Sequence, residues 1–389
     1  MSAPDAAAVA GVPFLDLGWQ HRIVEAEVRD AVDEILASTA FVGGPHVARF
    51  EAAFAAACGV DHCVGVANGT DAIELGLRAL GIGPGDTVVV PANTFIATAE
   101  AVWRAGAAVS VADVDPATLL LDPVALEPVL ARDRPRAVIA VDLYGQIAPM
   151  EELVPLAEAH GAVVVEDAAQ AQGARRHHRG IAHGVALAST SFYPGKNLGA
   201  YGDGGAVLTR SSELAERVRL LGAHGSRVRY HHEVPGTNSR LDTIQAAVLS
   251  AKLAHLEAWN DLRRAAAARY AALLDDAVRQ GVDIVTTATA TGNTHAWHLY
   301  VVRVPERDAV LADLQAAGIG AAIHYPVPVH RTPAFAHLAD RRCPVAESAA
   351  DRILSLPMYP GITTAQQARV VEALVDSVRR HQRTGAAVA

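Results

Sequence analysis

Two lysines stand among the 33 basic residues of the sequence, and the first of them, Lys196, lies in a glycine-rich turn. Gly195 precedes it and Gly199 follows, so the backbone there is able to approach a ligand closely. A lysine shielded from water has a lowered pKa, and its neutral amine can form a Schiff base with a carbonyl compound. A phosphate-binding lysine is one alternative, although the GxxxxGK spacing of a P-loop is absent, and a solvated surface lysine is the other. The scarcity of lysine favours a chemical role for Lys196.

A second candidate group follows the apolar run Val163–Val165, which leads directly into Glu166 and Asp167. Ligands of open α/β sheets bind beyond the carboxyl ends of the strands, so we expect Asp167 at a ligand site. A carboxylate there is able to pair with a metal, a ribose hydroxyl or a protonated ring nitrogen. The alternative is that Asp167 only caps the helix that follows.

The segment Asn68–Ala72 has the pattern of a strand end, an Asn-Gly turn and the start of a helix. Gly69, Thr70 and Asp71 would offer free N–H groups, and Thr70 a hydroxyl, which together form a cup for an anion. An ordinary capped helix is the alternative interpretation.

Phe95 follows another apolar run, Asp86–Val90, and is also expected near the carboxyl end of a strand. Aromatic residues make up only 5% of the chain, so a ring at this place is a candidate for stacking on a planar cofactor. Filling of the core is the alternative.

The elements that must position these groups alternate along the chain. Apolar runs of strand length, separated by helical stretches, predict an α/β fold whose mostly parallel sheet has helices on both faces. The stretch from Thr243 to about Arg279 lacks Gly and Pro and predicts one long amphipathic helix. A strand at Trp297–Val304, a helix at about Glu306–Ala317 and a last helix at about Thr364–Arg383 would complete a smaller C-terminal α/β domain. The predicted parts are a loose tail at 1–12, a large domain at 13–245, and the connecting helix with the small domain at 246–389.

Composition excludes several classes of protein. The chain has 389 residues, of which 51% are hydrophobic and 19% charged, so it is able to bury a large core. Its net charge of −9 argues against nucleic acid or an anionic membrane as a partner. Charges such as Glu100 and Arg104 interrupt every apolar stretch before it reaches membrane-spanning length. Three cysteines without a CxxC spacing favour a reducing compartment, and we expect a cytoplasmic protein. No metal site is expected from His177, His178 and His183, since no Cys or acid completes a standard spacing.

Taken together, a Schiff-base lysine, an acid for a ring nitrogen, a phosphate cup and a stacking ring are the components of a pyridoxal phosphate (PLP) enzyme. The chain also resembles the DegT/DnrJ/EryC1/StrS group of sugar aminotransferases, which have the aspartate-aminotransferase fold (PLP fold type I). The resemblance extends from Phe14 to at least Pro328. It is carried by NGTDA at Asn68, PANTFIATA at Pro91, EDAAQA at Glu166, SFYPGKNLGAYGDGGAV at Ser191 and GTNSRLDTIQAA at Gly236. Two positions depart from the group, which usually has Asp where this chain has Ala186 and often has His where it has Asp142.

The resemblance implies roles for individual residues. Lys196 would carry the cofactor PLP and Asp167 would bind its ring nitrogen, which makes these two the catalytic residues. Gln170 would contact the ring hydroxyl and Phe95 would stack on the ring. The phosphate would be held by Gly69, Thr70, Asp71 and Ser191. Asn238 would reach the phosphate of the neighbouring subunit's cofactor, because members of the group form homodimers with shared active sites.

The resemblance also implies transamination, with L-glutamate as donor and a keto sugar linked to a nucleotide as acceptor. Relatives that deoxygenate sugars replace the lysine with His, whereas this chain keeps Lys196. The GTNSRLD segment is most similar to members that aminate C3 of a dTDP-3-keto-6-deoxyhexose. Amination at C4, amination of a ketocyclitol and a non-catalytic role remain alternatives. Candidate substrate residues are Tyr325, His324, Arg240 and Arg331, where an arginine would bind the diphosphate.

Overall fold

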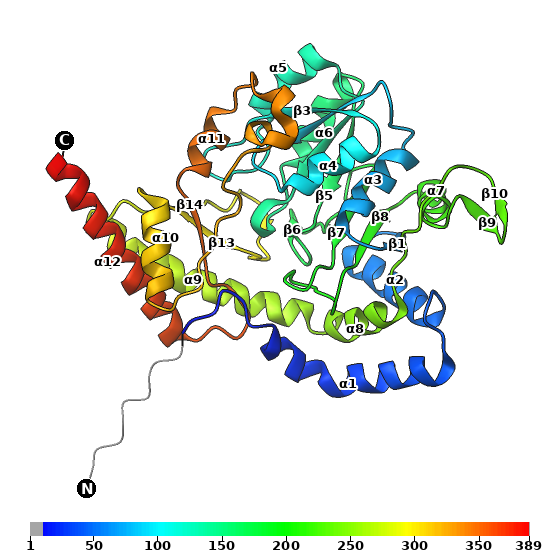
Figure 1. The fold of residues 1–389 in the computed structure, drawn as a ribbon, viewed down its shortest axis with the longest axis horizontal. Coiled ribbons are helices and arrows are strands. Elements are labelled where there is room, and N and C mark those ends of the chain that lie inside the picture. Colours follow the sequence, from blue (N-terminus) through cyan, green and yellow to red (C-terminus); the bar gives the residue numbers. More distant parts are fainter. Residues whose placement is uncertain (1–10, 389) are drawn as a thin grey trace, which may run out of the picture.

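The computed structural model describes residues 11–388, and its centre is a seven-stranded sheet (Figure 1). The strands follow the order β1, β8, β7, β5, β4, β2, β3 across the sheet. All of them run parallel except β8, which is antiparallel to its neighbours β1 and β7. Their bounds are β1 (His62–Val66), β2 (Thr87–Pro91), β3 (Ala108–Ala112), β4 (Ala137–Val141), β5 (Val163–Asp167), β7 (Leu187–Ser191) and β8 (Gly205–Thr209). This confirms the predicted mostly parallel sheet.

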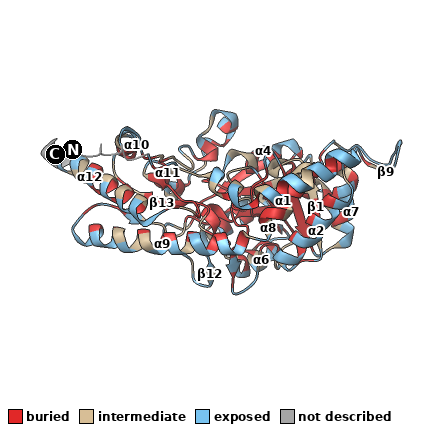
Figure 2. Ribbon diagram, turned by 90° about the horizontal axis from the view of Figure 1, so that it is seen from below, coloured by how far each residue is buried: buried red, intermediate tan, exposed pale blue. Residues whose placement is uncertain are grey.

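Successive side chains of each strand point to opposite faces of the sheet, and both faces are apolar. Helices cover both faces. Val88 and Val90 contribute to the core on one face, together with α3, α4 and α7. Val89 contributes to the core on the other face, with α2, α5, α6 and α8. Figure 2 shows the buried residues gathered between these layers. The bounds are α2 (Pro45–Cys58), α3 (Gly69–Ala79), α4 (Ile96–Arg104), α5 (Pro123–Asp133), α6 (Met150–Ala159), α7 (Ser212–Gly222) and α8 (Thr243–Leu253).

The stretch predicted as one helix forms two, α8 and α9 (Leu256–Arg279), which separate at Ala254 and His255. The prediction of an uninterrupted helix is therefore wrong at this point. The two helices pack against different parts of the molecule. Helix α8 contacts α1 (Leu17–Ser38) and α2, whereas the later part of α9 belongs to the C-terminal core. Neither Gly nor Pro marks the break, so tertiary packing and not a local signal places it.

The C-terminal domain is a three-stranded antiparallel sheet, ordered β11, β13, β14, that packs with helices. Its elements besides α9 are β11 (Val285–Thr286), β13 (Tyr300–Arg303), α10 (Arg307–Ala316), β14 (Ile353–Leu356) and α12 (Thr364–Val388). The strand expected from Trp297 begins three residues later, at Tyr300. Trp297 has a φ of +49°, a left-handed conformation that is incompatible with an extended strand.

The predicted boundaries differ from the packing at two places. Residues 1–10 of the expected tail lie outside the described residues, but Val12 is buried and its N–H donates to Gly318 O at 2.9 Å. Val12 is therefore part of the packed structure. Residues 329–349, expected in the small domain, include side chains that pack into the core on one face of the large sheet.

Short elements connect these layers. They are β6 (Arg175–Arg176), β9 (Ser226–Val228), β10 (His231–His232), β12 (Asn293–Thr294), α11 (Pro344–Ala350) and three 3₁₀ turns, Leu143–Gly145, Val329–Arg331 and Pro333–Leu338. The β9–β10 hairpin projects from the large domain (Figure 1). Within residues 11–388, no helix combines the length and hydrophobicity needed to cross a bilayer.

Candidate active site

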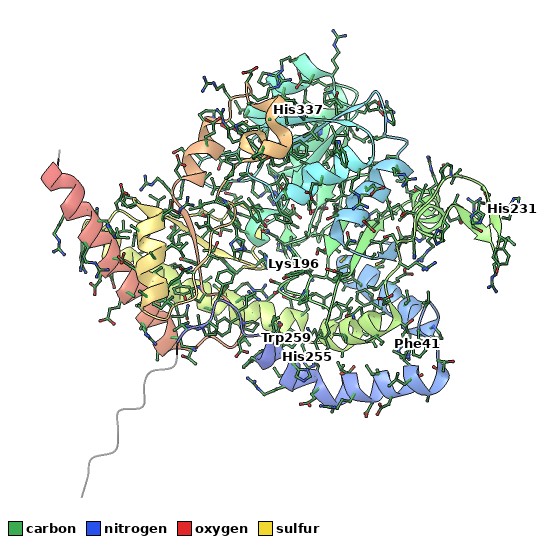
Figure 3. All side chains as sticks on the ribbon, in the orientation of Figure 1. Phe41, Lys196, His231, His255, Trp259 and His337 are labelled. Atoms are coloured by element: carbon green, nitrogen blue, oxygen red, sulfur yellow. The ribbon has the colours of Figure 1, made fainter. Side chains whose placement is uncertain are left out.

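A cavity of about 490 Å³ lies at the carboxyl ends of the parallel strands, where the C-terminal domain meets the large sheet. Figure 3 shows Lys196 near the centre of the molecule, at this meeting point. Most residues predicted for the site line the cavity, including two from the C-terminal part of the chain. They are Gly69, Thr70, Phe95, Asp167, Gln170, Ser191, Lys196, His324 and Tyr325.

Lys196 lies in a tight turn after β7. Its N–H donates to Tyr193 O at 2.8 Å, and the N–H of Ala200 donates to Phe192 O at 2.7 Å, so the turn is closed by its own backbone. The side chain lines the cavity, and no described residue hydrogen-bonds its amine. Burial lowers the pKa of Lys196 to about 8, against the opposing effect of the Asp167 charge. An appreciable fraction of the amine is therefore neutral near pH 7, as a nucleophile or a base requires.

The other lysine, Lys252, supports this turn from behind. Its Nζ donates to Gly199 O at 2.6 Å and lies 4.5 Å from the centre of the Tyr201 ring. A Cβ on Gly199 would lie 2.3 Å from Pro194 O, so only glycine allows the turn to close this tightly. The sequence analysis assigned no role to Lys252.

Asp167 ends β5 and is buried at the floor of the cavity. Its Oδ2 accepts a hydrogen bond from Thr98 Oγ1 at 2.9 Å, and its Oδ1 accepts one from the Ala169 N–H at 3.2 Å. Burial raises the pKa of Asp167, while these two donors and the charge of Lys196 act in the opposite direction. The carboxylate is thus placed to pair with a cationic group inside the cavity.

The start of α3 faces Ser191 at the end of β7. Asn68 caps the helix by accepting the Asp71 N–H at 2.8 Å, which leaves the N–H groups of Gly69 and Thr70 without a described acceptor. A Cβ on Gly69 would lie 2.7 Å from Ser191 Cβ, so glycine lets the helix start approach the serine. These two N–H groups and the hydroxyl-bearing residues Thr70 and Ser191 line the cavity, an arrangement that suits an anion.

Asp71 does not join this cup through its side chain. Its carboxylate forms an ion pair with Arg104 Nη2 at 2.9 Å and does not line the cavity. The expected contact of Asp71 with a phosphate is therefore restricted to its backbone, and that N–H already donates to Asn68.

Gln170 connects the large domain to the C-terminal wall of the cavity. Its Oε1 accepts the Tyr144 N–H at 2.6 Å, and its Nε2 donates to Tyr325 Oη at 3.1 Å. The Tyr325 ring lies 5.0 Å from the half-exposed ring of Phe95. Two aromatic rings, tilted by 35° to each other, therefore lie beside a fixed amide group.

The C-terminal wall includes two buried or half-buried histidines. His324 Nδ1 lies 2.9 Å from Ser355 Oγ and its ring stacks on Phe14 at 5.5 Å, while burial lowers the pKa of His324 to about 4. His298 lies 3.2 Å from Asn197 Oδ1, and burial lowers its pKa strongly. Both rings are therefore neutral near pH 7. His298 and Phe14 were not predicted as site residues, because no local pattern links them to the motifs.

Three predicted residues lie away from the cavity of their own chain. Arg331 donates to Glu347 Oε1 at 3.0 Å and to Ala339 O, so its guanidinium is already engaged. Asn238 and Arg240 are exposed on the segment that follows the β9–β10 hairpin. A direct contact of these three with a ligand in the same chain's cavity is not supported by the geometry.

The histidine-rich segment near β6 forms the edge of a second, smaller cavity of about 240 Å³. Arg176 there donates to Glu151, and His177 lies 3.4 Å from Glu151 Oε1. Among the described residues, no group of three or more His, Cys, Asp or Glu is arranged to hold a metal ion.

Several known proteins are similar to this chain in sequence and in structure. The model of the DegT/DnrJ/EryC1/StrS aminotransferase family matches residues 22–375. A dTDP-3-amino-3,4,6-trideoxy-alpha-D-glucose transaminase of Streptomyces venezuelae is 47% identical over 371 residues, 95% of this chain and 97% of that protein. A pleiotropic regulatory protein of Geobacillus stearothermophilus is 44% identical over 370 residues, 95% of this chain and 99% of that protein. The crystal structure of S. venezuelae DesV in complex with a ketimine intermediate superposes with a TM-score of 0.91 at 46% identity, covering 95% of this chain and 99% of that chain.

Proposed function

This chain belongs to the DegT/DnrJ/EryC1/StrS aminotransferase family, and from that premise we propose that it aminates C3 of a dTDP-linked 3-keto-6-deoxyhexose, with L-glutamate as donor. The chain is a PLP-dependent aminotransferase. The 47% identity to a transaminase whose product carries its amino group at C3 supports the choice of that carbon. The observation that carries the proposal is a partly buried Lys196 amine, which no described residue hydrogen-bonds, in a cavity that also contains the Asp167 carboxylate.

The residues of the cavity fit PLP group by group. The free N–H groups of Gly69 and Thr70, with the hydroxyl of Ser191, suit the phosphate. Asp167 suits the ring nitrogen, and the exposed ring of Phe95 suits one face of the pyridine. Gln170, whose amide is already oriented by Tyr144, suits the ring hydroxyl.

When bound, the cofactor supplies an electron sink that stabilises negative charge at the substrate carbon being deprotonated. We assign to Lys196 Nζ the removal of the Cα proton of the amino donor and, in the second half-reaction, the return of a proton to C3 of the sugar. Positioned acid–base catalysis of this kind contributes about 10²–10⁴-fold to the rate. Asp167 keeps its negative charge against the ring nitrogen, and Thr98 holds the carboxylate in place.

The first experiment is the visible absorption spectrum of the purified protein with added PLP, before and after L-glutamate. We expect a yellow band that disappears with L-glutamate, and no such band in Lys196→Ala. A folded protein that binds no PLP would contradict the enzyme assignment and favour a non-catalytic role, which the 44% identity to a regulatory protein makes the second candidate.

The acceptor is then identified by product analysis with three classes of ketone. A dTDP-3-keto-6-deoxyhexose, the matching 4-keto sugar and a ketocyclitol are offered to the protein after its reaction with L-glutamate. We expect return of the yellow band and an amino product with the 3-keto sugar. Turnover of only the 4-keto sugar or only the ketocyclitol would replace the proposed substrate and leave the transaminase assignment standing.

We also propose a cytoplasmic homodimer in which Asn238 of one subunit reaches the cofactor phosphate of the other. Its exposure and its distance from the cavity of its own chain support this role. Mixing Lys196→Ala with Asn238→Asp tests it, because a hybrid dimer would contain one site with both native residues. We expect about a quarter of wild-type activity from the statistical mixture, and no gain on mixing if each site is built from one chain.

A further inference from the structure

Two carboxyl groups lie against each other behind the cavity, on Asp142 and Glu166. Asp142 follows β4 and is 0% exposed, and Glu166 in β5 is 1% exposed. Glu166 and Asp167 are successive residues of a strand, so their side chains point to opposite faces of the sheet. Asp167 faces the active-site cavity, whereas Glu166 lines the smaller cavity on the other face.

The hydrogen bonds of this pair leave a fully buried oxygen of Asp142 without a donor. Asp142 Oδ1 accepts the Ala148 N–H at 2.9 Å, and Glu166 Oε2 accepts the Ala182 N–H. Asp142 Oδ2 is buried and receives no hydrogen bond from an N–H or O–H group of the described residues. In the parallel register of β4 and β5, Ala140 pairs with Glu166, so Asp142, two residues further on, lies on the same face of the sheet, and its carboxyl interacts with that of Glu166. Two buried carboxylates in contact repel each other, and a proton between them removes the repulsion and satisfies the oxygen.

We propose that Asp142 and Glu166 share one proton, and that this acid pair is a positioning unit for the cofactor-facing residues Asp167 and Gln170. The second half of the proposal rests on the proposed function, since it takes Asp167 and Gln170 to face PLP. Burial, with Glu166 next to it, raises the pKa of Asp142, and burial also raises that of Glu166.

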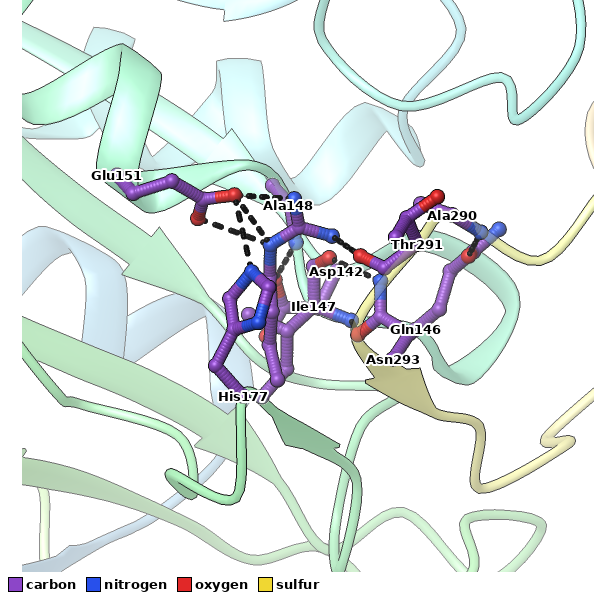
Figure 4. A network of polar contacts seen from close by, with 10 residues as sticks. Asp142, Gln146, Ile147, Ala148, Glu151, His177, Ala290, Thr291 and Asn293 are labelled. Atoms are coloured by element: carbon purple, nitrogen blue, oxygen red, sulfur yellow. Dashed lines mark hydrogen bonds and ion pairs between the residues drawn. The ribbon is translucent and has the colours of Figure 1, made fainter.

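Asp142 is joined to both cofactor-facing residues by short connections. Its N–H donates to Asp167 O at 3.0 Å, which fixes the end of β5. Its carboxyl closes the turn 142–148 through Ala148, as Figure 4 shows. That turn carries Tyr144, with a φ of +64°, whose N–H holds Gln170 Oε1. The acid pair thereby orients the Gln170 amide so that its Nε2 points towards Tyr325.

Among the residues that the structure describes, no cation is in place to substitute for the proton. Arg176, on the β6 side of the smaller cavity, is occupied by Glu151 and by Thr291 O. In the described part of the chain, neither Asp142 nor Glu166 forms an ion pair. The other titratable groups around the pair are Asp167 on the same strand, Cys58 at the end of α2, and His177, Arg179 and His183 around the smaller cavity.

The number of protons bound by the Asp142–Glu166 pair is measured by equilibrium unfolding of the PLP-loaded protein at fixed concentration. Asp142→Asn keeps an acceptor for Ala148 and donates an N–H to Glu166, so its folded state needs no shared proton. The ratio of the unfolding constants of wild type and Asp142→Asn should rise tenfold per pH unit between about pH 6 and pH 8. Glu166→Gln should give the same ratio. A ratio that does not change with pH would overturn the shared proton, whatever the substrate of the enzyme.

A matched control separates this effect from the loss of a buried acid. Asp113 is buried and accepts the N–H groups of Val114, Val345 and Ala346, so its carboxylate is satisfied by the backbone. Asp113→Asn should lower stability without reproducing the tenfold slope. An equal slope in Asp113→Asn would count against the acid pair as its source.

The positioning role is tested with Asp142→Ala, which removes the contact to Ala148. We expect its dissociation constant for PLP to rise about tenfold, and the pH midpoint of its visible band to shift, while Asp142→Asn retains both wild-type values. Unchanged PLP affinity and an unchanged midpoint in Asp142→Ala would overturn the positioning role. The shared proton would not be affected by that result, because the unfolding experiment tests it separately.

Discussion

Gln170 and Tyr325, which are 155 residues apart in the sequence, are joined by a hydrogen bond of 3.1 Å across the cavity. This bond connects the large sheet to the C-terminal wall, which Tyr144 Oη also contacts by donating to His324 O at 2.7 Å. The orientation of Gln170 therefore depends on both parts of the molecule. A small change at Tyr325 should consequently alter the affinity for PLP.

Tyr325→Phe removes the hydroxyl that accepts from Gln170 Nε2. We expect PLP to bind about fivefold more weakly, as for the loss of one buried hydrogen bond, with a similar fall in kcat/KM. Spectroscopic titration with PLP and steady-state kinetics measure the two effects. Tyr270→Phe is the matched control, because its hydroxyl donates to Pro357 O in the C-terminal domain. That control should lose stability and keep the PLP affinity; equal effects in both variants would exclude a specific role for Tyr325.

The pH dependence of PLP uptake should follow the protonation state of the Lys196 amine. Its pKa is lowered to about 8, and only the neutral amine attacks a carbonyl, so the rate of uptake by the apoprotein should rise about tenfold per pH unit below pH 8 and level off above. Asp167 raises the pKa of Lys196, and Asp167→Asn should therefore move the midpoint to lower pH. Asp203→Asn, another acid of the cavity lining, should leave it in place. Stopped-flow absorbance gives both midpoints, and a shift to higher pH in Asp167→Asn would contradict the assignment.

Gly69→Ala should weaken the binding of the cofactor phosphate at the start of α3. The added Cβ would lie 2.7 Å from Ser191 Cβ, so the start of α3 must move away from the serine. We expect PLP affinity to fall at least about tenfold, with little change in the affinity for pyridoxal, which lacks the phosphate. In Gly83→Ala the nearest atom is Ala105 O at 3.5 Å, an ordinary contact, and its PLP affinity should be that of wild type. If pyridoxal binding falls as much as PLP binding, the defect lies outside the cup.

Lys252→Met should remove a gain in stability that wild type shows as the pH rises from about 8 to 10.5. Burial lowers the pKa of Lys252 to about 8, so between about pH 8 and pH 10.5 the unfolded chain binds a proton that the folded chain does not. Wild type therefore gains stability from this group as pH rises through that window, and Lys252→Met lacks the gain. Urea unfolding at several pH values measures the difference. A difference that is constant across the window would show that Lys252 titrates normally in the folded protein.

Much of the site could be predicted because its residues belong to local patterns. Asp167 follows an apolar strand, Gly69 and Thr70 begin a helix, and Lys196 sits among glycines. Since parallel strands end at one edge of a sheet, such patterns converge in space. The apolar run Val163–Val165, predicted to lead into Asp167, lies within β5 (Val163–Asp167).

The remaining features depend on contacts between distant segments. No local pattern indicates that the Asp71 carboxylate pairs with Arg104 outside the cup, or that Arg331 pairs with Glu347. The break between α8 and α9 likewise has no local breaker. His298 entered the cavity through the packing of the C-terminal domain, which no motif describes.

Both lysines of this chain report on one loop, since Lys196 projects from it and Lys252 holds its Gly199 carbonyl. Protein grown with isotope-enriched lysine would therefore carry a two-signal magnetic resonance probe without any engineering. One signal would follow the chemistry at the reactive amine and the other would follow the loop that supports it. Because the sequence contains no further lysine, the spectrum would have no background from the surface.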